Sequence, residues 1–383
     1  MAGARRTVVV AMSGGVDSSV AAALCVEAGH RVIGVMLRLW ADPGAGTANR
    51  CCSDEAVGHA AAVAGDLGIA FRVLEAGAEF KRHVVDAFVA ASAAGQTPNP
   101  CMECNRRIRF GWLLERVEAL GGDVLVTGHY ARVDLAPGGL RRLRRGVDPA
   151  KDQSYVLSIL GQSELARVSF PLGGLTKSEV RRLAVRRGIA VADRPDSVDL
   201  CWLGTDGLTA FLDRNLPPDA LVPGPIVDRS GRVLGTHRGL PRYTVGQRRG
   251  LGLSLGDARY VTRKDVAENA LVVGDAGELG CRRLRAVGWH WVAGGPPAVG
   301  PWRVLAQTRY RAAAAPAVLE EHPDGCMVAT FDHAERAVTP GQYLVAYEKR
   351  DAASGLDKDI YGQRVAADGT PAGSAFRIGA SNY

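Results

Sequence analysis

Short runs of β-branched residues alternate with alanine- and leucine-rich stretches over roughly the first half of the chain. The runs that predict buried strands are Val8–Met12, Arg31–Leu39, Ala70–Leu74 and Asp123–Thr127. The stretches that predict helices are Ser18–Ala28, Asp54–Leu67, Glu79–Ala94 and Phe110–Leu120. Because parallel strands that alternate with helices are joined by right-handed crossovers, this order predicts an α/β domain with a parallel sheet covered on both faces.

The pattern changes after about residue 208. Proline- and glycine-rich turns such as Pro223-Gly224-Pro225 separate short runs such as Arg259–Thr262 and Ala270–Val273, which is typical of small antiparallel β domains. Further strand candidates, which indicate a small barrel, are Trp302–Thr308, Ala317–Leu319, Cys326–Phe331 and Tyr343–Tyr347. The expected division is a domain at 1–208, a β-rich central domain at 209–282, a C-terminal β-barrel at 283–348 and an atypical tail at 349–383, with a strand at Asp359–Val365.

Arginine dominates the positive charge of the chain. Only six of the 47 basic residues are lysines, and the formal net charge is +7. A GC-rich genome accounts for part of this bias, but the arginines also gather in separate patches, at 105–109, 141–145, 181–187, 248–249 and 282–283. Because guanidinium groups bind phosphates in bidentate geometry, several patches suit a long polyanion better than one small ligand. With 47% hydrophobic residues the chain is globular rather than disordered.

Targeting signals and cysteine usage both point to the cytoplasm. No stretch reaches the roughly 18 apolar residues of a membrane span, and the apolar run after Arg5-Arg6 breaks at Ser13-Gly14-Gly15, unlike a signal peptide. We therefore expect a cytoplasmic protein with no membrane partner. Eight cysteines in so long a chain are not a secreted disulfide framework, so functional cysteines are expected to be redox, metal-binding or catalytic thiols.

The segment Ala11–Ser19 lies between a predicted strand and a predicted helix. Its two glycines allow close approach of the backbone to a phosphate, its serines add hydrogen-bond donors, and the helix directs its positive end at the loop. The Gly-Lys-Ser/Thr ending of the common triphosphatase loop is missing. The segment instead resembles the Ser-Gly-Gly-x-Asp-Ser pyrophosphate loop of the ATP pyrophosphatase superfamily, whose members adenylate a substrate with ATP. This resemblance implies ATP and Mg²⁺ as cofactors, with Asp17 as a Mg²⁺ ligand.

Two cysteine-containing segments follow the loop. Thr97–Asn105 contains Cys101 and Cys104 at Cys-x-x-Cys spacing, and Asp196–Gly204 contains Cys201. A lone Cys-x-x-Cys leaves open a zinc site, a redox pair or coincidence. In order along the chain stand five more motifs, Thr127–Tyr130, Lys151–Tyr155, Gly246–Gly252, Thr308–Arg311 and Thr339–Gln342. Taken together, these motifs resemble those of the bacterial tRNA-specific 2-thiouridylases over roughly residues 5–348.

The resemblance implies a fold and a reaction. The fold is an adenine-nucleotide α-hydrolase-like α/β domain, followed by a small central β-rich domain and a C-terminal β-barrel. The reaction adenylates the C2 oxygen of the wobble uridine of tRNA and then replaces it with sulfur, giving 2-thiouridine, AMP and pyrophosphate. The nucleophile corresponds to Cys104 and the persulfide carrier to Cys201, and the two thiols form a redox disulfide during turnover.

The resemblance also assigns binding residues and partners. The ATP-binding positions correspond to Ala11, Met12, Ser13, Gly14, Gly15, Val16, Asp17, Ser18, Met36 and Gly128. The tRNA-binding positions correspond to Asn99, Pro100, Cys101, His129, Lys151, Asp152, Gln153, Arg309, Tyr310 and Gln342. The implied partners are tRNAs for Lys, Glu and Gln and a sulfur donor such as a cysteine desulfurase or a sulfur-relay protein. Many members of the family have Asp where this chain has Cys101, so the role of that position is in doubt.

Three alternatives stay open from the sequence. Cys101, Cys104 and Cys201 are enough thiolates to hold a [4Fe–4S] cluster with one open iron, which would make thiolation cluster-dependent. The loop alone also fits a non-thiolating ligase or amidotransferase, and the basic patches alone fit a tRNA-binding module without turnover. We favour the persulfide route. Cys25, Cys281 and Cys326 are expected to be structural thiols, and Cys51-Cys52 has no assigned role.

Overall fold

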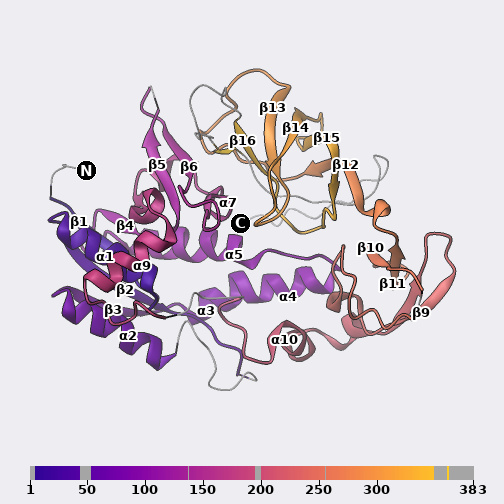
Figure 1. The fold of residues 1–383 in the computed structure, drawn as a ribbon, viewed down its shortest axis with the longest axis horizontal. Coiled ribbons are helices and arrows are strands. Elements are labelled where there is room, and N and C mark those ends of the chain that lie inside the picture. The colour runs from indigo at the N-terminus through magenta and orange to yellow at the C-terminus, as the bar shows by residue number, and fades with distance from the viewer. Residues whose placement is uncertain are drawn as a thin grey trace.

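The computed structural model describes residues 5–43, 53–136, 138–194, 200–254 and 256–348, and the backbone of residues 360–361. Cys51-Cys52, residues Asp196–Asp199 of the segment that contains Cys201, and most of the tail lie outside the described residues. The described chain forms three larger sheets, which follow one another along the sequence, and one hairpin inserted between two strands of the first sheet (Figure 1).

The first sheet is parallel throughout, in the order β3-β2-β1-β4-β7. Its strands are β1 (Thr7–Ala11), β2 (Arg31–Arg38), β3 (Ala70–Glu75), β4 (Val124–Val126) and β7 (Val168–Ser169). Successive residues of β1 enter different cores, because Val8 and Val10 pack on one face of the sheet and Val9 on the other. The predicted parallel α/β sheet, buried on both faces, is confirmed.

The helices of this part of the chain follow the predicted pattern, with one instructive difference. They are α1 (Val16–Glu27), α2 (Asp54–Asp66), α3 (Gly77–Phe80), the π-helix η2 (Lys81–Val85), α4 (Asp86–Ala93), α5 (Pro100–Glu103), the π-helix η3 (Cys104–Leu113), α6 (Leu114–Arg116), α7 (Ser154–Leu157), α8 (Gln162–Leu165), the 3₁₀-helix η4 (Pro171–Gly174), α9 (Lys177–Arg186) and α10 (Gly207–Asn215). The helix expected at Phe110–Leu120 begins ten residues earlier, at Pro100, and ends at Arg116. Proline suits the first helical position because no donor is needed there.

A basic hairpin leaves the first sheet after β4. Its strands β5 (Ala131–Leu135) and β6 (Arg141–Arg145) pair antiparallel. The Asp134 carboxylate forms ion pairs with the Nε atoms of Arg142 (2.9 Å) and Arg144 (2.6 Å). Part of the positive charge of this arginine patch is therefore neutralised within the hairpin. The arginines of this segment were recognisable in the sequence as a basic patch, but the hairpin was not predicted.

The central sheet is small and mixed, in the order β10-β11-β8-β9. Its strands are β8 (Gly224–Val227), β9 (Val233–His237), β10 (Tyr260–Asp265) and β11 (Ala270–Gly274), and its 3₁₀-helices are η5 (Pro218–Leu221), η6 (Leu240–Arg242) and η7 (Gly277–Leu279). The β11–β8 pair is parallel and the other two pairs are antiparallel. An entirely antiparallel domain was therefore too simple an expectation.

The C-terminal sheet is antiparallel, in the order β12-β15-β14-β13-β16-β17. Its strands are β12 (Gly280–Ala286), β13 (Trp302–Gln307), β14 (Ala315–Glu321), β15 (Met327–Arg336), β16 (Val345–Glu348) and β17 (Ile360–Tyr361). The strand predicted in the tail is present at Ile360–Tyr361, where it pairs with β16. The fold class predicted from the sequence, an α/β domain followed by a small central domain and a C-terminal barrel domain, is confirmed.

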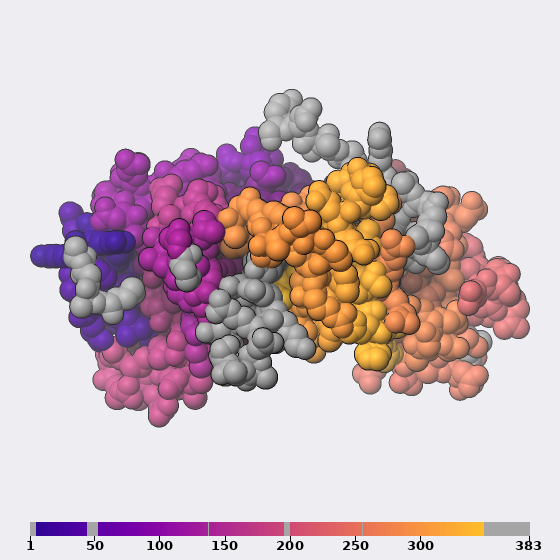
Figure 2. Space-filling model, turned by 90° about the horizontal axis from the view of Figure 1, so that it is seen from above, coloured from indigo at the N-terminus to yellow at the C-terminus, as the bar shows by residue number. Residues whose placement is uncertain are grey.

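The C-terminal barrel lies over the junction between the N-terminal and central parts of the chain (Figures 1 and 2). The segment that leads to α5 contacts both later parts, since the Thr97 amide donates to the Pro340 carbonyl (2.8 Å) and the Lys264 ammonium lies 3.4 Å from the Gln96 carbonyl. α5 is therefore held where three parts of the molecule meet. In the part of the chain that the structure describes, no helix has the length and apolar character needed to cross a bilayer.

Candidate active site

The loop between β1 and α1 has the geometry of a phosphate-binding loop. Gly14 has φ +71°, and a Cβ there would lie 2.6 Å from the Ala56 carbonyl oxygen of α2, so only glycine fits. Gly15 is the N-cap of α1. The hydroxyls of Ser18 and Ser19 both donate to the Gly15 carbonyl, at 3.1 and 2.9 Å, and the Ser13 amide donates to the Ser18 hydroxyl. These bonds stabilise the loop before any ligand binds.

Asp17 of this loop is held by two residues from distant parts of the chain. Its carboxylate oxygens accept from the Lys177 ammonium at 2.7 and 2.8 Å, and the Tyr130 hydroxyl donates to it at 2.7 Å. Gly128 allows this approach, because a Cβ there would lie 2.9 Å from the backbone of Asp17 and Ser18. The structure thus brings the predicted ATP-binding positions Asp17, Ser18 and Gly128 together.

Two cationic side chains near the loop were not recognised in the sequence. Lys177 begins α9, and Arg194 donates to the Gly14 carbonyl at 3.0 Å. The Thr176-x-x-Glu179 capping box signals the start of α9, but nothing local signals that Lys177 reaches Asp17. Together with the N-terminus of α1, these cations make the surroundings of the loop favourable for the negative charge of a polyphosphate.

The remaining predicted ATP-binding residues line the carboxyl end of the sheet. Ala11 ends β1, and the Met12 amide donates to the Val35 carbonyl of β2 at 2.7 Å. Met12, Val16 and Met36 are buried in the core on one face of the sheet. Ligands of open parallel sheets bind at this edge, beyond the carboxyl ends of the strands.

Cys101 and Cys104 lie one helical turn apart at the start of the α5–η3 helix. η3 is π-helical from Cys104 to Leu113, a geometry that is often found at functional sites. Asn99 is the N-cap residue, with no side-chain cap bond, and Pro100 is buried at the first helical position. Asn105 anchors the helix, because its side-chain amide donates to the Val156 carbonyl of α7 at 3.1 Å.

Cys104 and Cys201, distant in the sequence, pack against the same apolar cluster. The cluster is built around Phe80, Phe88, Trp202 and Phe211; Cys104 is buried within it and Cys201 is half-buried at its edge. Trp202 stacks edge-on against Phe80 and Phe88, at centroid distances of 5.5 and 5.9 Å. Neither cysteine is in a disulfide in this structure, and the disulfide expected during turnover stays a prediction.

Cys101 differs from Cys104 in its surroundings. Although Cys101 is exposed as a residue, protein around its sulfur raises the pKa of the thiol to about 11; nearby Cys104 adds to the rise and Arg109 opposes it. Cys101 is therefore protonated at neutral pH. Arg109 is the arginine whose charge acts on Cys101, whereas Arg107 lies 4.0 Å from Glu103.

His129 is inside the protein rather than at its surface. Its ring lies between those of Phe110 and Phe170, at 5.8 and 6.0 Å, and its Nδ1 is 2.7 Å from the Thr127 hydroxyl. Burial, reinforced by Arg109, lowers the pKa of His129 to about 3, so the ring is neutral. In this structure the ring has a packing role, and its contact with tRNA stays a prediction.

The Lys151–Gln153 motif supports the backbone around the site. The Gln153 side chain accepts from the Tyr130 amide at 3.0 Å, and Asp152 accepts from the Gly146 and Ser154 amides. Lys151 is half-buried. Asp152 and Gln153 thus hold the residues that follow Gly128, and their predicted tRNA contacts are untested.

The predicted C-terminal tRNA contacts lie next to this motif. Tyr310 packs near Tyr155, with ring centroids 6.1 Å apart, and Arg309 is exposed beside it. Gln342 donates to the Thr97 carbonyl at 2.6 Å, which joins the barrel to the segment that leads to α5. The structure therefore places Tyr310 beside the Lys151–Tyr155 motif and joins Gln342 to the segment that leads to α5.

Two sets of metal-binding groups can be tested against the geometry. Asp17 is paired with Lys177 through both oxygens, which does not fit a direct Mg²⁺ ligand. Within the described residues, His322, Asp324 and Cys326 place their ligand atoms within 4.8 Å of one another, but Arg285 donates to both Cys326 and Asp324. A guanidinium already occupies the position of a cation there, and we assign no metal to this cluster.

Comparison with known proteins agrees with this arrangement. Three family models match, described as a tRNA methyl transferase HUP domain at residues 6–205, a tRNA methyl transferase PRC-barrel domain at 209–275 and an aminomethyltransferase β-barrel domain at 281–352. Among solved structures, the ATP-bound complex of a 4-thiouridine synthetase with RNA matches 56% of this chain and 51% of that chain with 17% identity and a TM-score of 0.35, a likeness too low to support an argument.

The curated relatives are much closer. The tRNA-specific 2-thiouridylase MnmA of Chloroflexus aurantiacus is 49% identical over 349 residues, which cover 91% of this chain and 97% of that protein. The protein of the same name from Geobacter metallireducens is 43% identical over 366 residues, with coverage of 92% and 96%. Such identity over nearly the whole of both chains shows that this chain belongs to the tRNA-specific 2-thiouridylase family.

Proposed function

We propose that the chain thiolates the wobble uridine of tRNA at C2, using ATP and a cysteine persulfide. The observation that carries this proposal is the packing of Cys104 and Cys201 against one apolar cluster, in the domain that also contains the pyrophosphate loop. A non-thiolating ligase would need the loop but not this thiol pair. Membership of the 2-thiouridylase family supports the same choice.

The first step activates the uridine. The C2 oxygen is a poor leaving group, so it attacks the α-phosphate of ATP, forms an AMP ester and releases pyrophosphate. The Ser13–Ser18 loop and the N-terminus of α1 would bind the departing pyrophosphate, and Lys177 and Arg194 would stabilise its charge. Because Asp17 pairs with Lys177, no step here uses Mg²⁺ held by the protein.

The second step transfers sulfur. A sulfur donor loads Cys201 as a persulfide, whose terminal sulfur attacks C2 while AMP leaves with the C2 oxygen. The Cys104 thiolate then attacks the Cys201 sulfur, which forms the Cys104–Cys201 disulfide and leaves the terminal sulfur on the uridine as a thiocarbonyl. An external thiol reductant restores both thiols. The apolar cluster limits access of water to the persulfide.

Cys101 takes a different part in this scheme. As a neutral thiol next to Cys104 it can donate a proton, as an acid at that position would, but at neutral pH it is not a thiolate nucleophile. We assign Asn99, Pro100 and Cys101 to the target-base side of the site and Arg309 and Tyr310 to the tRNA backbone. The assigned substrates are tRNAs for Lys, Glu and Gln, and the assigned sulfur donor is a cysteine desulfurase or relay protein.

A cluster-dependent version of the reaction is the second candidate. The charge of Cys104 acts on Cys101, and Cys104 packs in the same cluster as Cys201, so all three thiols belong to one region. They would hold a [4Fe–4S] cluster, whose open iron would supply bound sulfide. In either version the thiol chemistry needs a reducing compartment, which supports the predicted cytoplasmic location. The domain division at residues 208, 282 and 348 remains part of the proposal.

The test is thiolation of a tRNA transcript by purified protein with ATP, Mg²⁺ and a persulfide donor, read as retardation in a mercury-containing gel. Cys104→Ser and Cys201→Ser should each reduce thiolation by at least about 10³-fold, because the nucleophile or sulfur carrier is removed, while tRNA affinity stays within about twofold. Cys281→Ser, which changes a thiol of β12 that packs against the C-terminal core and not against this cluster, is the matched control and should retain full activity.

Other outcomes separate the alternatives. If the wild-type protein binds tRNA but never thiolates it, the proposed thiolation activity is wrong. Pyrophosphate release stimulated by an amino acid and not by tRNA would indicate a ligase. Iron–sulfur absorbance in anaerobically purified protein, lost in Cys101→Ser together with thiolation, would replace the persulfide route with the cluster route.

A further inference from the structure

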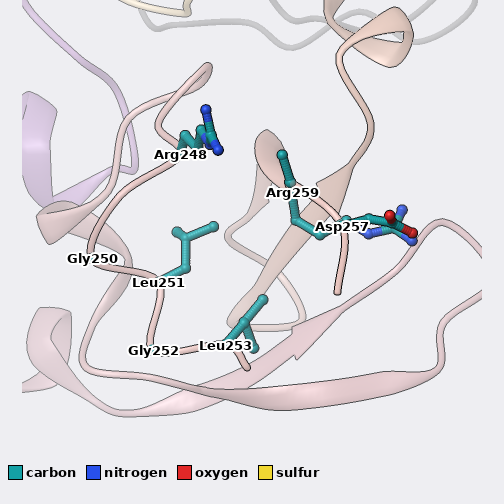
Figure 3. Close-up of a pocket in the computed structure, with 8 residues that line it drawn as sticks. Arg248, Gly250, Leu251, Gly252, Leu253, Asp257 and Arg259 are labelled. Atoms are coloured by element: carbon teal, nitrogen blue, oxygen red, sulfur yellow. The ribbon is translucent and has the colours of Figure 1, made fainter. Parts of the chain in front are cut away.

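A small basic pocket lies in the central sheet region, outside the candidate active site. It has a volume of about 180 Å³ and is lined by the Gly250–Leu253 segment, Arg248, Asp257, Ala258 and Arg259. Figure 3 shows Arg248 on one side of the pocket and Asp257 and Arg259 on the other, with the Leu251–Leu253 segment along the lower side of the view. This volume is below the range of pockets that enclose a drug-sized ligand, so it suits a single group of a larger molecule.

The loop that forms one wall is built in a defined shape. The Gln247 side chain accepts from the Thr244 amide at 3.0 Å and donates to the Arg249 carbonyl at 2.9 Å. The Gly246 amide donates to the Val261 carbonyl, and the Val261 amide donates to the Gln247 carbonyl, so the loop is fastened to β10. Gly250 and Gly252 have positive φ angles, +76° and +68°. The backbone on either side of Arg248 is thus fixed without a ligand.

The arginines of the pocket have unused hydrogen-bonding capacity. The Nε of Arg259 is buried and has no hydrogen-bond partner, which is unfavourable unless a ligand supplies an acceptor. Within the described part of the chain, neither Arg248 nor Arg259 takes part in an ion pair. Two guanidinium groups outnumber the single carboxylate of Asp257, so the pocket favours an anion.

The pocket is connected to the active-site helix through β10. Arg259 immediately precedes this strand, and Lys264 near its other end donates to the Tyr243 carbonyl at 3.0 Å and approaches the Gln96 carbonyl at 3.4 Å. Five residues of strand span about 17 Å. That distance corresponds to a few nucleotides, so one RNA molecule at α5 could also reach the pocket.

We propose that this pocket binds one phosphate of the tRNA backbone, with Arg248 and Arg259 as its donors. The inference rests on the proposed function, since it takes tRNA to be the substrate, and it adds a binding site in the central part of the chain. The contact positions the RNA and does not read its sequence, because a phosphate is the same at every nucleotide.

The test is the salt dependence of the dissociation constant of a tRNA transcript. Arg248→Gln combined with Arg259→Gln should weaken binding by at least about tenfold at 0.15 M salt and make the slope of log K against log salt less steep by about 2, one for each phosphate-binding charge removed. Arg229→Gln combined with Arg232→Gln removes two charges from the β8–β9 turn, where Asp228 already pairs with Arg232, and is the control.

The outcomes are distinct. If the wild-type protein thiolates tRNA but the double variant keeps its affinity and slope, the pocket is not a phosphate site and the proposed function stands. If the wild-type protein does not bind tRNA, the proposed function itself fails. Because loss of Arg259 could disturb the fold, Arg259→Lys is measured as well; it should retain the salt slope and the melting temperature, whereas equal losses in the control variant would overturn the proposal.

Discussion

Arg109 determines the local charge around the candidate active site. Its guanidinium donates to the Asn105 side chain at 3.3 Å, and its charge acts on both Cys101 and His129. It favours the deprotonated form of both groups, which is the thiolate of Cys101 and the neutral ring of His129. The active site is therefore adapted to anions, which agrees with a polyphosphate and RNA as its proposed ligands.

The buried His129 should make the protein sensitive to acid. The pKa of His129 is about 3 in the folded protein and near 6.5 when unfolded, so between these values the unfolded chain binds more protons. Stability should therefore fall as the pH decreases below 6.5, with a slope from this residue of up to about 1.4 kcal/mol per pH unit. Urea unfolding at pH 4.5, 5.5 and 7 measures this slope.

His129→Gln should show a flatter pH dependence than the wild-type protein over that range, even if its stability at pH 7 is lower. The matched control is His333→Gln, which removes an exposed histidine from β15. Parallel curves for the wild type and His129→Gln would contradict the neutral, buried state of this ring.

At the scale of elements, the strand–loop–helix unit of β1 and α1 depends on packing against α2. Gly14 and Gly29 stand at the two ends of α1, and both have positive φ angles, +71° and +79°. A Cβ at Gly29 would meet nothing within 4 Å, whereas a Cβ at Gly14 would lie 2.6 Å from the α2 backbone. A substitution at Gly29 therefore introduces backbone strain alone, whereas a substitution at Gly14 introduces both strain and a steric clash.

Gly29→Ala should reduce stability by about 1 kcal/mol, through strain alone, and leave ATP use unchanged. Gly14→Ala should displace the loop from α2 and reduce tRNA-dependent pyrophosphate release by at least about tenfold, beyond its effect on stability. Melting temperature and pyrophosphate release are the two measurements. Similar activities in the two variants would show that the close contact at Gly14 does not control the loop.

At the scale of the whole molecule, the two later parts of the chain hold the segment before α5. Lys264 comes from the central sheet, Pro340 and Gln342 come from the C-terminal barrel domain, and all three contact Gln96 or Thr97. The Tyr343 hydroxyl also donates to Glu103, next to Cys104. The position of the cysteines therefore depends on domains that carry none of the proposed catalytic residues.

Lys264→Met should weaken this junction. Its loss leaves the Tyr243 and Gln96 carbonyls without their ammonium donor, so we expect thiolation to fall about three- to tenfold with a small change in stability. Burial lowers the pKa of Lys264 to about 8, from 10.5 when unfolded. Between these values the unfolded chain binds more protons, and the wild-type protein should gain stability as the pH rises from 8 to 10.5.

Lys264→Met lacks the titrating amine and should not show the gain in stability that Lys264 contributes between pH 8 and 10.5. Unfolding free energies of the wild type and Lys264→Met at pH 7.5, 9 and 10 measure the difference. If the difference between the two proteins does not change with pH, Lys264 is not enclosed as the structure shows.

Local patterns in the sequence determined most of the strands and helices of the first domain and its pyrophosphate loop. The period and length of apolar runs predicted β1, β2, β3, β4 and the helices α1 and α2 within a few residues, because each strand and helix carries its own repeat of buried positions. The pyrophosphate loop was recognisable because its glycines, serines and Asp17 are consecutive. Such patterns did not predict that the helix begins at Pro100, because the segment before it is held by hydrogen bonds from other domains.

The tertiary structure alone decided which distant side chains meet. Three features join segments far apart in the sequence: the pairing of Asp17 with Lys177, the shared cluster of Cys104 and Cys201, and the burial of His129 between two phenylalanines. No local pattern encodes such contacts, since they arise only when whole elements pack and exclude water. For the same reason proton states such as those of Cys101 and His129 were decided by burial, and not by residue type.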